Sequence, residues 1–375
     1  GNYSVTITNR YGMASSDPIR VGIVSIGISG DNSLGQRDAP ASATGLVNIA
    51  AGSWHFLGLR EDGTVCAWGA NYDGQCDPPQ DPGYVLAIAA GGYHSLAILD
   101  DLSVRAWGAN QSGQCAVPAD LGKAIAIAGG QWHSVAARVD GTVRAWGDNS
   151  WGQAQAPAAL TNVVSVAAGA IHTLALRSDG TVAAWGGNDD GQGYWSGQAV
   201  APQNLRARAI AAGDYHNLAL LTNGSVVAWG ANNHWQCAVP ATVTNAVAIA
   251  AGAAHSIALL RNGLVIAWGA NESGQCSIWQ SARAPVAITA GGVCSGVLWE
   301  DGALPPRLWV QSISMRNFAA AAQTRCGQKY ELQWTVSLAS GLWNNLGPVE
   351  GNGALMMFRH AHAPQATGFY KLVIR

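Results

Sequence analysis

Short apolar runs alternate with glycine-rich turns along most of this chain. Runs such as Ala87–Gly91 and His94–Ile98 are followed by clusters of Gly, Asn, Asp and Ser. Apolar runs of four to six residues bounded by turn residues are typical of buried β-strands and too short for ordinary helices. The pattern therefore predicts an all-β protein.

The runs recur with a fixed period. The triplet Ala-Trp-Gly ends at Gly69, Gly108, Gly147, Gly186, Gly230 and Gly269, at intervals of 39, 39, 39, 44 and 39 residues. A histidine keeps the same intervals, at His55, His94, His133, His172, His216 and His255, and Cys294 occupies the next equivalent position. A period of about 40 residues that holds four short strands indicates a β-propeller.

Each period predicts four strands, which we call A to D. Examples are Ala87–Gly91 for A, His94–Ile98 for B, Thr142–Trp146 for C and Gln114–Pro118 for D. An Asp-Gly or Asn-Gly pair usually joins B to C, which is the preferred sequence of a tight hairpin. Blade two departs from this pattern with Asp101-Leu102.

The seventh period is divided between the two ends of the repeat region. Pro285–Trp299 supplies strands A and B, after which the pattern stops. The segment Ser29–Pro40 aligns with Trp68–Pro79 at an offset of 39 residues. We therefore predict a seven-bladed propeller of four-stranded blades whose last blade is completed by the N-terminal segment, which hides two sheet edges.

The motif Gly-x-x-His-Ser-Leu-Ala, followed by Asp-Gly-Thr-Val-x-Ala-Trp-Gly-x-Asn-x-x-Gly-Gln, resembles the repeat of the regulator of chromosome condensation family. The short period, the Val-Pro ending of several blades and the split blade are most similar to secreted bacterial propellers that inhibit β-lactamases. The resemblance covers about residues 24–300. It implies the propeller fold and, because one fold hosts many functions, only a general expectation of binding.

The flanking segments differ from the repeat. Residues 1–23 resemble the last two strands of an immunoglobulin-like domain or form a linker, 24–303 form the propeller, and 304–375 form a small β-rich C-terminal module similar to those of secreted bacterial proteins. We expect a secreted or cell-surface bacterial protein on the basis of these flanks. The chain shows no signal peptide, and we expect that it was cut from a longer precursor.

Candidate contact residues gather in the A–B and C–D loops, which lie on one face of a propeller. Blades one to three place Trp54, Tyr72, Tyr93, Trp132 and Trp151 there, and blades four and five add Asp189, Asp190, Tyr215 and His234. A five-residue insertion in blade four contains Tyr194 and Trp195. Trp and Tyr are enriched among residues that dominate binding energy, although packing between loops would also explain some of them. In the β-lactamase inhibitors that this chain resembles, the same positions carry aromatic contacts, which implies a similar face rather than the same partner.

The repeated polar residues favour structural roles. Zinc needs ligand nitrogens about 2.0–2.1 Å from one ion, whereas equivalent residues of neighbouring blades are separated by roughly 10 Å. We therefore predict no metal site and no cofactor, and expect each repeated histidine to bond backbone groups of its own or the next blade. The same spacing argues against disulfides between the four cysteines that occupy equivalent positions after a glutamine in different blades, namely Cys76, Cys115, Cys237 and Cys276.

Composition narrows the function classes further. Charged residues make up 11% of the chain and the net charge is −2, which does not fit a basic nucleic-acid-binding surface. No apolar run reaches the length of a membrane span. No catalytic or phosphate-binding motif is present, so we predict a protein-binding module that is not an enzyme, with inhibition of a secreted or periplasmic enzyme as one form. A carbohydrate- or small-ligand-binding module and a hydrolase with a site at the channel mouth are the alternatives.

Overall fold

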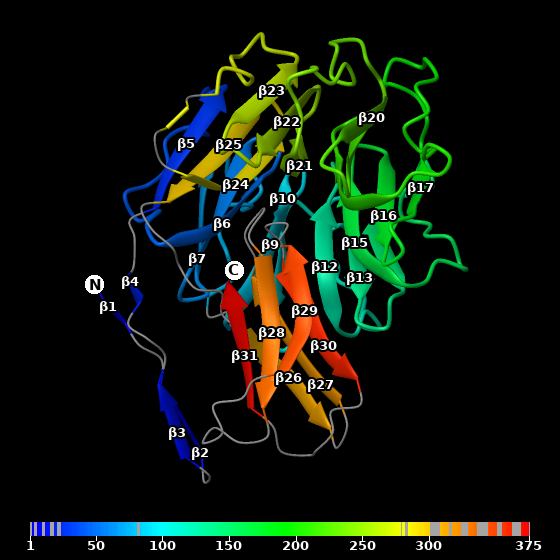
Figure 1. Ribbon diagram of the computed structural model, residues 1–375. Coiled ribbons are helices and arrows are strands. Elements are labelled where there is room, and N and C mark those ends of the chain that lie inside the picture. The colour runs from blue at the N-terminus through cyan, green and yellow to red at the C-terminus, as the bar shows by residue number, and fades with distance from the viewer. Residues whose placement is uncertain are drawn as a thin grey trace. The chain divides into compact units, whose positions relative to one another are not determined.

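The chain divides into two compact units. Ser25–Trp299 form one unit, and Gly1–Val24 with Glu300–Arg375 form the other. The computed structural model describes residues 25–299 apart from 81–82, 279 and 282–283, and of residues 1–24 and 300–375 it describes the strands alone. Figure 1 labels most strands of the two units.

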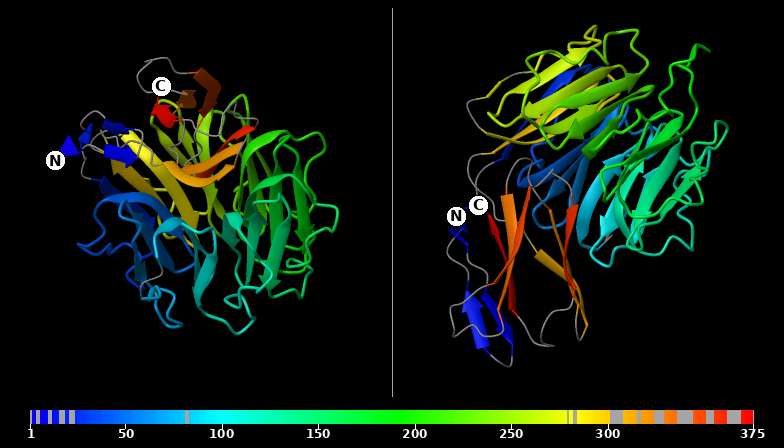
Figure 2. Two further views of the ribbon diagram at one scale, coloured as in Figure 1. Left: turned by 90° about the horizontal axis from the view of Figure 1, so that it is seen from below. Right: turned by 45° about the vertical axis from the view of Figure 1, so that its right-hand side comes forward.

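The larger unit contains seven antiparallel three-stranded sheets, each with strand B in the middle. Figure 2 shows these sheets arranged radially as the blades of a propeller. The A strands of blades one to seven are β6 (Leu46–Ala51), β9 (Val85–Ala90), β12 (Ala124–Gly129), β15 (Val163–Ala168), β18 (Ala207–Ala212), β21 (Ala246–Ala251) and β24 (Ala284–Gly291). The B strands are β7 (His55–Arg60), β10 (His94–Leu99), β13 (His133–Arg138), β16 (His172–Arg177), β19 (His216–Leu221), β22 (His255–Leu260) and β25 (Cys294–Glu300). The C strands are β8 (Val65–Gly69), β11 (Val104–Gly108), β14 (Val143–Gly147), β17 (Val182–Gly186), β20 (Val226–Gly230), β23 (Val265–Gly269) and β5 (Val24–Gly30).

The last blade is closed by the N-terminal segment, as the sequence predicted. Its sheet has the order β24-β25-β5, so that a strand near residue 27 pairs with one near residue 297. The seven-bladed all-β fold is therefore confirmed, and the edge of β25 is covered.

The fourth strand of each blade was predicted but is replaced by turns. In blade two, Gln114–Pro118 contains no strand residues. The carbonyl of Gln114 accepts a hydrogen bond from Nε1 of Trp146 in the next blade (2.8 Å), and the amide of Cys115 donates to Oδ1 of Asn110 (2.8 Å). These bonds use backbone groups that a fourth strand would need for pairing with strand C.

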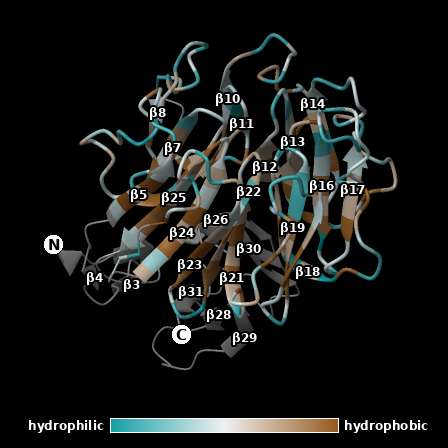
Figure 3. Cartoon of the chain, turned by 90° about the horizontal axis from the view of Figure 1, so that it is seen from above, coloured by the Kyte–Doolittle hydropathy of each residue, from teal (hydrophilic) through white to brown (hydrophobic). Residues whose placement is uncertain are grey.

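Apolar side chains of neighbouring blades pack together to form the core. Leu57 of blade one, for example, shares a cluster with Val85, Ala97 and Trp107 of blade two. All four are less than 9% exposed. Figure 3 shows the strands mostly in brown, the apolar colour, whereas the loops are mostly teal or white.

Each repeated histidine bonds a side-chain oxygen of the next blade. The expectation that these histidines bond backbone groups is therefore wrong. Nε2 of His55 lies 3.0 Å from Oγ of Ser95, and that hydroxyl donates to the carbonyl of Gln75 (2.9 Å). Because the hydroxyl proton is used in this way, Nε2 of His55 carries the proton and donates it to Ser95. The other five pairs, at 2.7–2.9 Å, are His94–Ser134, His133–Thr173, His172–Asn217, His216–Ser256 and His255–Ser295. We call these six pairs the histidine latches.

The interface between blades seven and one has no histidine latch. Cys294 occupies the histidine position of blade seven, and its thiol donates to the carbonyl of Asp31 (3.3 Å). Phe56 of blade one replaces the hydroxyl-bearing residue and stacks on Trp68 with ring centroids 5.6 Å apart. A Cβ atom added at Gly296 of blade seven would lie 3.1 Å from Cε1 of Phe56, so a glycine leaves room for the phenyl ring.

The smaller unit also consists of strands. Its N-terminal part has two antiparallel pairs, β1 (Asn2–Tyr3) with β4 (Ile19–Arg20) and β2 (Thr6–Asn9) with β3 (Gly12–Ser15). Its C-terminal part has two three-stranded sheets, one of β26 (Leu308–Ser314), β27 (Asn317–Gln323) and β30 (Leu355–Ala361), the other of β29 (Asn344–Glu350), β28 (Lys329–Thr335) and β31 (Phe369–Ile374). Within the described part of the chain, no helix has the length and apolar character needed to cross a membrane.

Candidate protein-binding face

The A–B and C–D loops of each blade lie against one another. The first amide after strand C donates to the carbonyl of the residue that precedes the histidine, as in Ala70 to Trp54 and Ala109 to Tyr93, both at 2.9 Å. The same bond recurs in blades three to six. We call the surface formed by these two sets of loops the loop face. All nine candidate contact residues belong to it.

Three of the candidate aromatic residues form a continuous row across blades one to three. Nε1 of Trp54 donates to the phenol oxygen of Tyr93 (3.2 Å). Tyr93 in turn stacks on Trp132, with ring centroids 4.9 Å apart and an angle of 20° between the planes. All three side chains are half-buried, so the row combines packing between blades with a partly exposed aromatic surface.

The two candidates in the C–D loops of blades one and three are more exposed. Tyr72 is 78% exposed and Trp151 is 52% exposed. Neighbouring loops are also connected, since Nε2 of Gln111 in blade two donates to Oδ1 of Asp73 in blade one (3.1 Å). An exposed aromatic side chain on a hydrogen-bonded loop offers apolar area without loss of much backbone freedom on binding.

The two acidic candidates of blade four shape the insertion that follows them. Oδ1 of Asp189 accepts from the amide of Gly191 (2.8 Å), and Oδ1 of Asp190 accepts from the amides of Gln192 (3.0 Å) and Tyr194 (3.1 Å). The second carboxylate oxygen of Asp190 accepts from Nδ2 of Asn233 in blade five (3.1 Å). Both residues therefore hold the loop in addition to presenting charge on its surface.

Tyr215 lies next to this insertion. A Cβ atom added at Gly191 would lie 2.5 Å from the Tyr215 hydroxyl, which places the phenol directly beneath the insertion. Burial and the nearby carboxylates, first that of Asp214 and then those of Asp189 and Asp190, raise the pKa of Tyr215. Burial also raises the pKa of Asp214 to about 6. Three carboxyl groups, those of Asp214, Asp189 and Asp190, therefore gather around Tyr215 on this part of the loop face.

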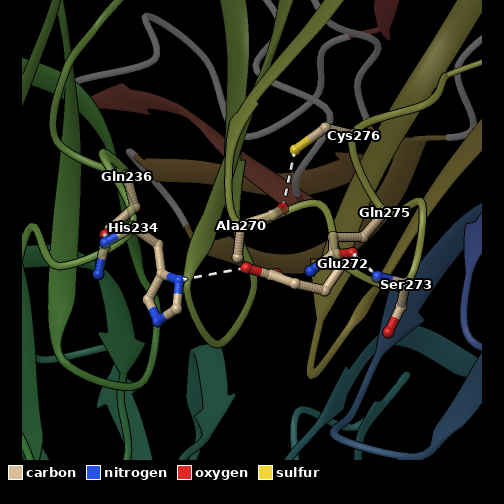
Figure 4. A network of polar contacts seen from close by, with 7 residues as sticks. All are labelled: His234, Gln236, Ala270, Glu272, Ser273, Gln275 and Cys276. Carbon is tan, nitrogen blue, oxygen red and sulfur yellow. Dashed lines mark hydrogen bonds and ion pairs between the residues drawn. The ribbon is translucent and has the colours of Figure 1, made fainter.

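His234 joins the C–D loops of blades five and six. Its Nδ1 lies 3.5 Å from Oε1 of Glu272, as Figure 4 shows. The two side chains are 50% and 71% exposed, so the ion pair contributes little stability. Together with the bond between Asp190 and Asn233, it connects the loops of three successive blades.

Three exposed aromatic residues of this region were not among the sequence candidates. Tyr194, Trp195 and Trp235 are 71%, 75% and 72% exposed. The sequence pattern places Tyr194 and Trp195 in the insertion, and the predicted contact residues do not include Trp235. Its signal in the sequence is the replacement of glycine in the Asn-x-x-Gly-Gln motif, which in this blade is Asn-Asn-His-Trp-Gln.

The cysteines that follow the glutamine of this turn, Cys76, Cys115, Cys237 and Cys276, are free thiols. Each donates to the carbonyl of a residue at the start of the same loop at 3.1–3.2 Å, for example Cys115 to Ala109. Burial raises the pKa of Cys115 to about 11 and that of Cys237 to about 12, which disfavours the reactive thiolate. Their arrangement points to a structural role in the C–D turn.

The strand order and the radial sheets define a seven-bladed propeller with an aromatic and acidic loop face. Residues 46–75, 85–114, 124–153, 163–192, 207–236 and 246–275 match the model described as the regulator of chromosome condensation (RCC1) repeat. The protein is therefore a propeller of the RCC1 type, with six such repeats. No curated protein matches its sequence.

Solved structures share this fold. Prp20p from Saccharomyces cerevisiae, described with its binding to Gsp1p and histones, is 18% identical, with a TM-score of 0.62 over 76% of this chain and 93% of that chain. Yeast RCC1 (Prp20) bound to Kap60 is 19% identical, with a TM-score of 0.64 over 76% and 90%. Human WBSCR16 is 22% identical, with a TM-score of 0.55 over 67% and 86%. At these identities the similarity demonstrates the fold alone.

Proposed function

We propose that this protein is a protein-binding module without catalytic activity, which docks a partner on its loop face. The observation that carries the proposal is the aromatic row Trp54–Tyr93–Trp132, together with the exposed rings of Tyr72 and Trp151. Interfaces obtain much of their binding energy from such aromatic residues. The structurally similar Prp20p is described by its binding to Gsp1p and histones, and thus also by protein partners.

We further propose that the module works outside the bacterial cytoplasm or at the cell surface. The similarity of its short repeat to that of secreted β-lactamase inhibitors supports secreted and periplasmic enzymes as the first partner class to test. Carbohydrate binding is less well supported, since Tyr93 and Trp132 cover one ring face of each other and leave less area for a sugar to stack on.

The test is capture from secreted and periplasmic proteins that include a panel of purified β-lactamases. The intact protein is compared with a triple variant, Trp54→Ala, Trp132→Ala and Trp151→Ala, and with the control Leu264→Ala, which truncates an exposed residue at the B–C turn on the opposite face. We expect a defined partner whose Kd rises at least about 100-fold in the triple variant, because several hot-spot side chains are lost together. Circular dichroism and thermal unfolding check that the triple variant is folded.

Two results would contradict the proposal. The first is a partner that binds a folded triple variant as tightly as the intact protein. The second is the absence of any protein partner together with binding on a glycan array or turnover of a hydrolase substrate.

A further inference from the structure

Trp235 stands in a backbone conformation that every other blade gives to glycine. Its φ is 63°, in the left-handed region. The equivalent glycines, Gly35, Gly74, Gly113, Gly152, Gly197 and Gly274, have φ between 73° and 80°. A bulky residue is rare in this region because its Cβ crowds the following carbonyl.

The turn around Trp235 keeps the hydrogen bonds of the other blades. The amide of Trp235 donates to the carbonyl of Asn232 (3.1 Å), and the amide of Cys237 donates to Oδ1 of Asn232 (2.8 Å). In blade six, Gly274 and Cys276 make the corresponding bonds to Asn271 at 3.0 and 2.8 Å. The indole therefore adds nothing to the turn that glycine does not already supply.

The indole also gains little from burial. Trp235 is 72% exposed, and Trp195 and Tyr194 of the neighbouring insertion are 75% and 71% exposed. Folding therefore leaves most of the apolar area of these three rings in water. Exposed aromatic groups concentrated on adjoining loops mark an interaction surface.

The loops that carry these rings are fixed to one another. Asn233, two residues before Trp235, donates to Oδ2 of Asp190 in blade four (3.1 Å), and Oδ1 of Asp190 accepts from the amides of Gln192 and Tyr194. A surface whose loops are already held in place loses less conformational freedom when a partner binds. We call Tyr194, Trp195 and Trp235 the outer aromatic patch.

Charge indicates which partner surface fits the outer aromatic patch. In the described loops of the loop face, Arg37 is the only arginine or lysine. The acidic residues of the same loops are Asp31, Asp38, Asp73, Asp77, Asp148, Asp189, Asp190, Asp214 and Glu272. The other described basic residues of the propeller, which lie at the opposite end of the blades among acidic ones, are Arg60, Arg105, Lys123, Arg138, Arg144, Arg177, Arg206, Arg208 and Arg261.

We propose that the outer aromatic patch, anchored by Trp235, docks a basic protein surface whose Arg and Lys side chains lie over the indole rings and between the surrounding carboxylates. Guanidinium and ammonium groups are attracted to the face of an indole, and this attraction adds to their pairing with carboxylates. Complementary charge also speeds the encounter and selects against acidic surfaces. This inference rests on the proposed protein-binding function and specifies the chemistry of the partner.

The test uses a displayed library of a small three-helix domain with randomised surface positions, selected on the intact protein at physiological salt. Selected domains are then titrated against Trp235→Gly, Glu272→Gln and the opposite-face control Leu264→Ala. We expect selected surfaces enriched in Arg and Lys, a Kd raised at least tenfold by Trp235→Gly, and a weaker dependence of Kd on salt for Glu272→Gln. Leu264→Ala is expected to leave the Kd unchanged.

Thermal unfolding separates binding from folding in this test. Glycine suits the left-handed position, so we expect Trp235→Gly to unfold at a temperature no lower than that of the intact protein. Trp235→Asn, with another residue that tolerates this conformation, is expected to lose binding equally.

Selected surfaces without an excess of Arg and Lys, or a Kd changed less than twofold by Trp235→Gly, would overturn the inference. Binders whose Kd is unchanged by Trp235→Gly but raised by Trp54→Ala and Trp132→Ala would overturn the inference and still support the proposed function. Binders whose Kd depends neither on the outer aromatic patch nor on Trp54 and Trp132, or the absence of any binder, would count against both the inference and the proposed function.

Discussion

Asp214 is a carboxylic acid whose ionised form is disfavoured by burial in the folded protein. It precedes Tyr215 in the A–B loop of blade five, where burial raises the pKa of its carboxyl to about 6. The folded protein therefore holds the proton more tightly than the unfolded chain, whose carboxyl has a pKa near 3.8. By linkage, the contribution of Asp214 to stability falls as the pH rises from about 4 to 6.

We predict that Asp214→Asn stabilises the propeller at pH 7.5. The shift in pKa sets an upper limit of about 3 kcal/mol, and partial exposure of the side chain lowers it. Urea unfolding should show the gain at pH 7.5 and its disappearance near pH 4, where the carboxyl is protonated in both states. Glu272→Gln, at an exposed acid of the same face, serves as the control. A gain that persists unchanged at pH 4 would show that ionisation is not its cause.

At the scale of the element, the six histidine latches make the interfaces between blades sensitive to acid. Burial lowers the pKa of these imidazoles to about 3 for His55, His133 and His216, and to about 4 for His94, His172 and His255. Below pH 6.5 the unfolded chain binds protons on these histidines and the folded propeller does not. Their stabilising contribution is complete above pH 6.5 and is lost as the pH falls towards 3–4.

We therefore predict cooperative acid unfolding between about pH 6 and 4, with several protons taken up. Each latch contributes a slope on the order of 1.4 kcal/mol per pH unit in this range. His94→Gln, whose side-chain amide can still donate to Ser134, should reduce the number of protons bound on unfolding at pH 5 by about one. Stability curves against pH with the same slope for both proteins would contradict a role of the latch in this sensitivity.

At the scale of the whole molecule, stability depends on how blade seven meets blade one. A Cβ atom at Gly296 would lie 3.0–3.1 Å from Thr289, Ile49 and Phe56. The corresponding positions of other blades hold larger residues such as Leu96 and Leu174. The glycine and the phenylalanine are thus complementary substitutions that occur where the ring closes.

We predict that Gly296→Leu destabilises the propeller by about 1–3 kcal/mol or more, because the added side chain overfills this interface. Phe56→Ser in the same protein should restore part of the loss by removing the ring that the leucine meets. Differential scanning calorimetry of the single and double variants measures both effects. If Phe56→Ser fails to relieve Gly296→Leu, the two residues are not coupled as the packing indicates.

Much of this molecule could be predicted because its sequence repeats one unit. The intervals between the histidines and between the Ala-Trp-Gly triplets determine the number of blades, and the offset of Ser29–Pro40 predicts the closing strand. The partner of each histidine could not be found in this way. In blades two to six the Ser, Thr or Asn residue after the histidine bonds the histidine of the preceding blade, and in blade seven the serine after Cys294 does so. This pairing depends on how blades stack. For Trp235 the motif shows that a tryptophan replaces the turn glycine, whereas the exposed fraction of its side chain comes from the structure.

The seam between blades seven and one has a consequence for the response of the ring to acid. It keeps two directional bonds, from Nε1 of Trp68 to the carbonyl of Gln36 (2.9 Å) and from the amide of Ala51 to Oγ1 of Thr289 (3.0 Å). The histidine and its partner are replaced there by Cys294 and Phe56. Protonation of buried imidazoles therefore weakens six junctions directly, whereas the contact that closes the ring does not depend on pH in this way.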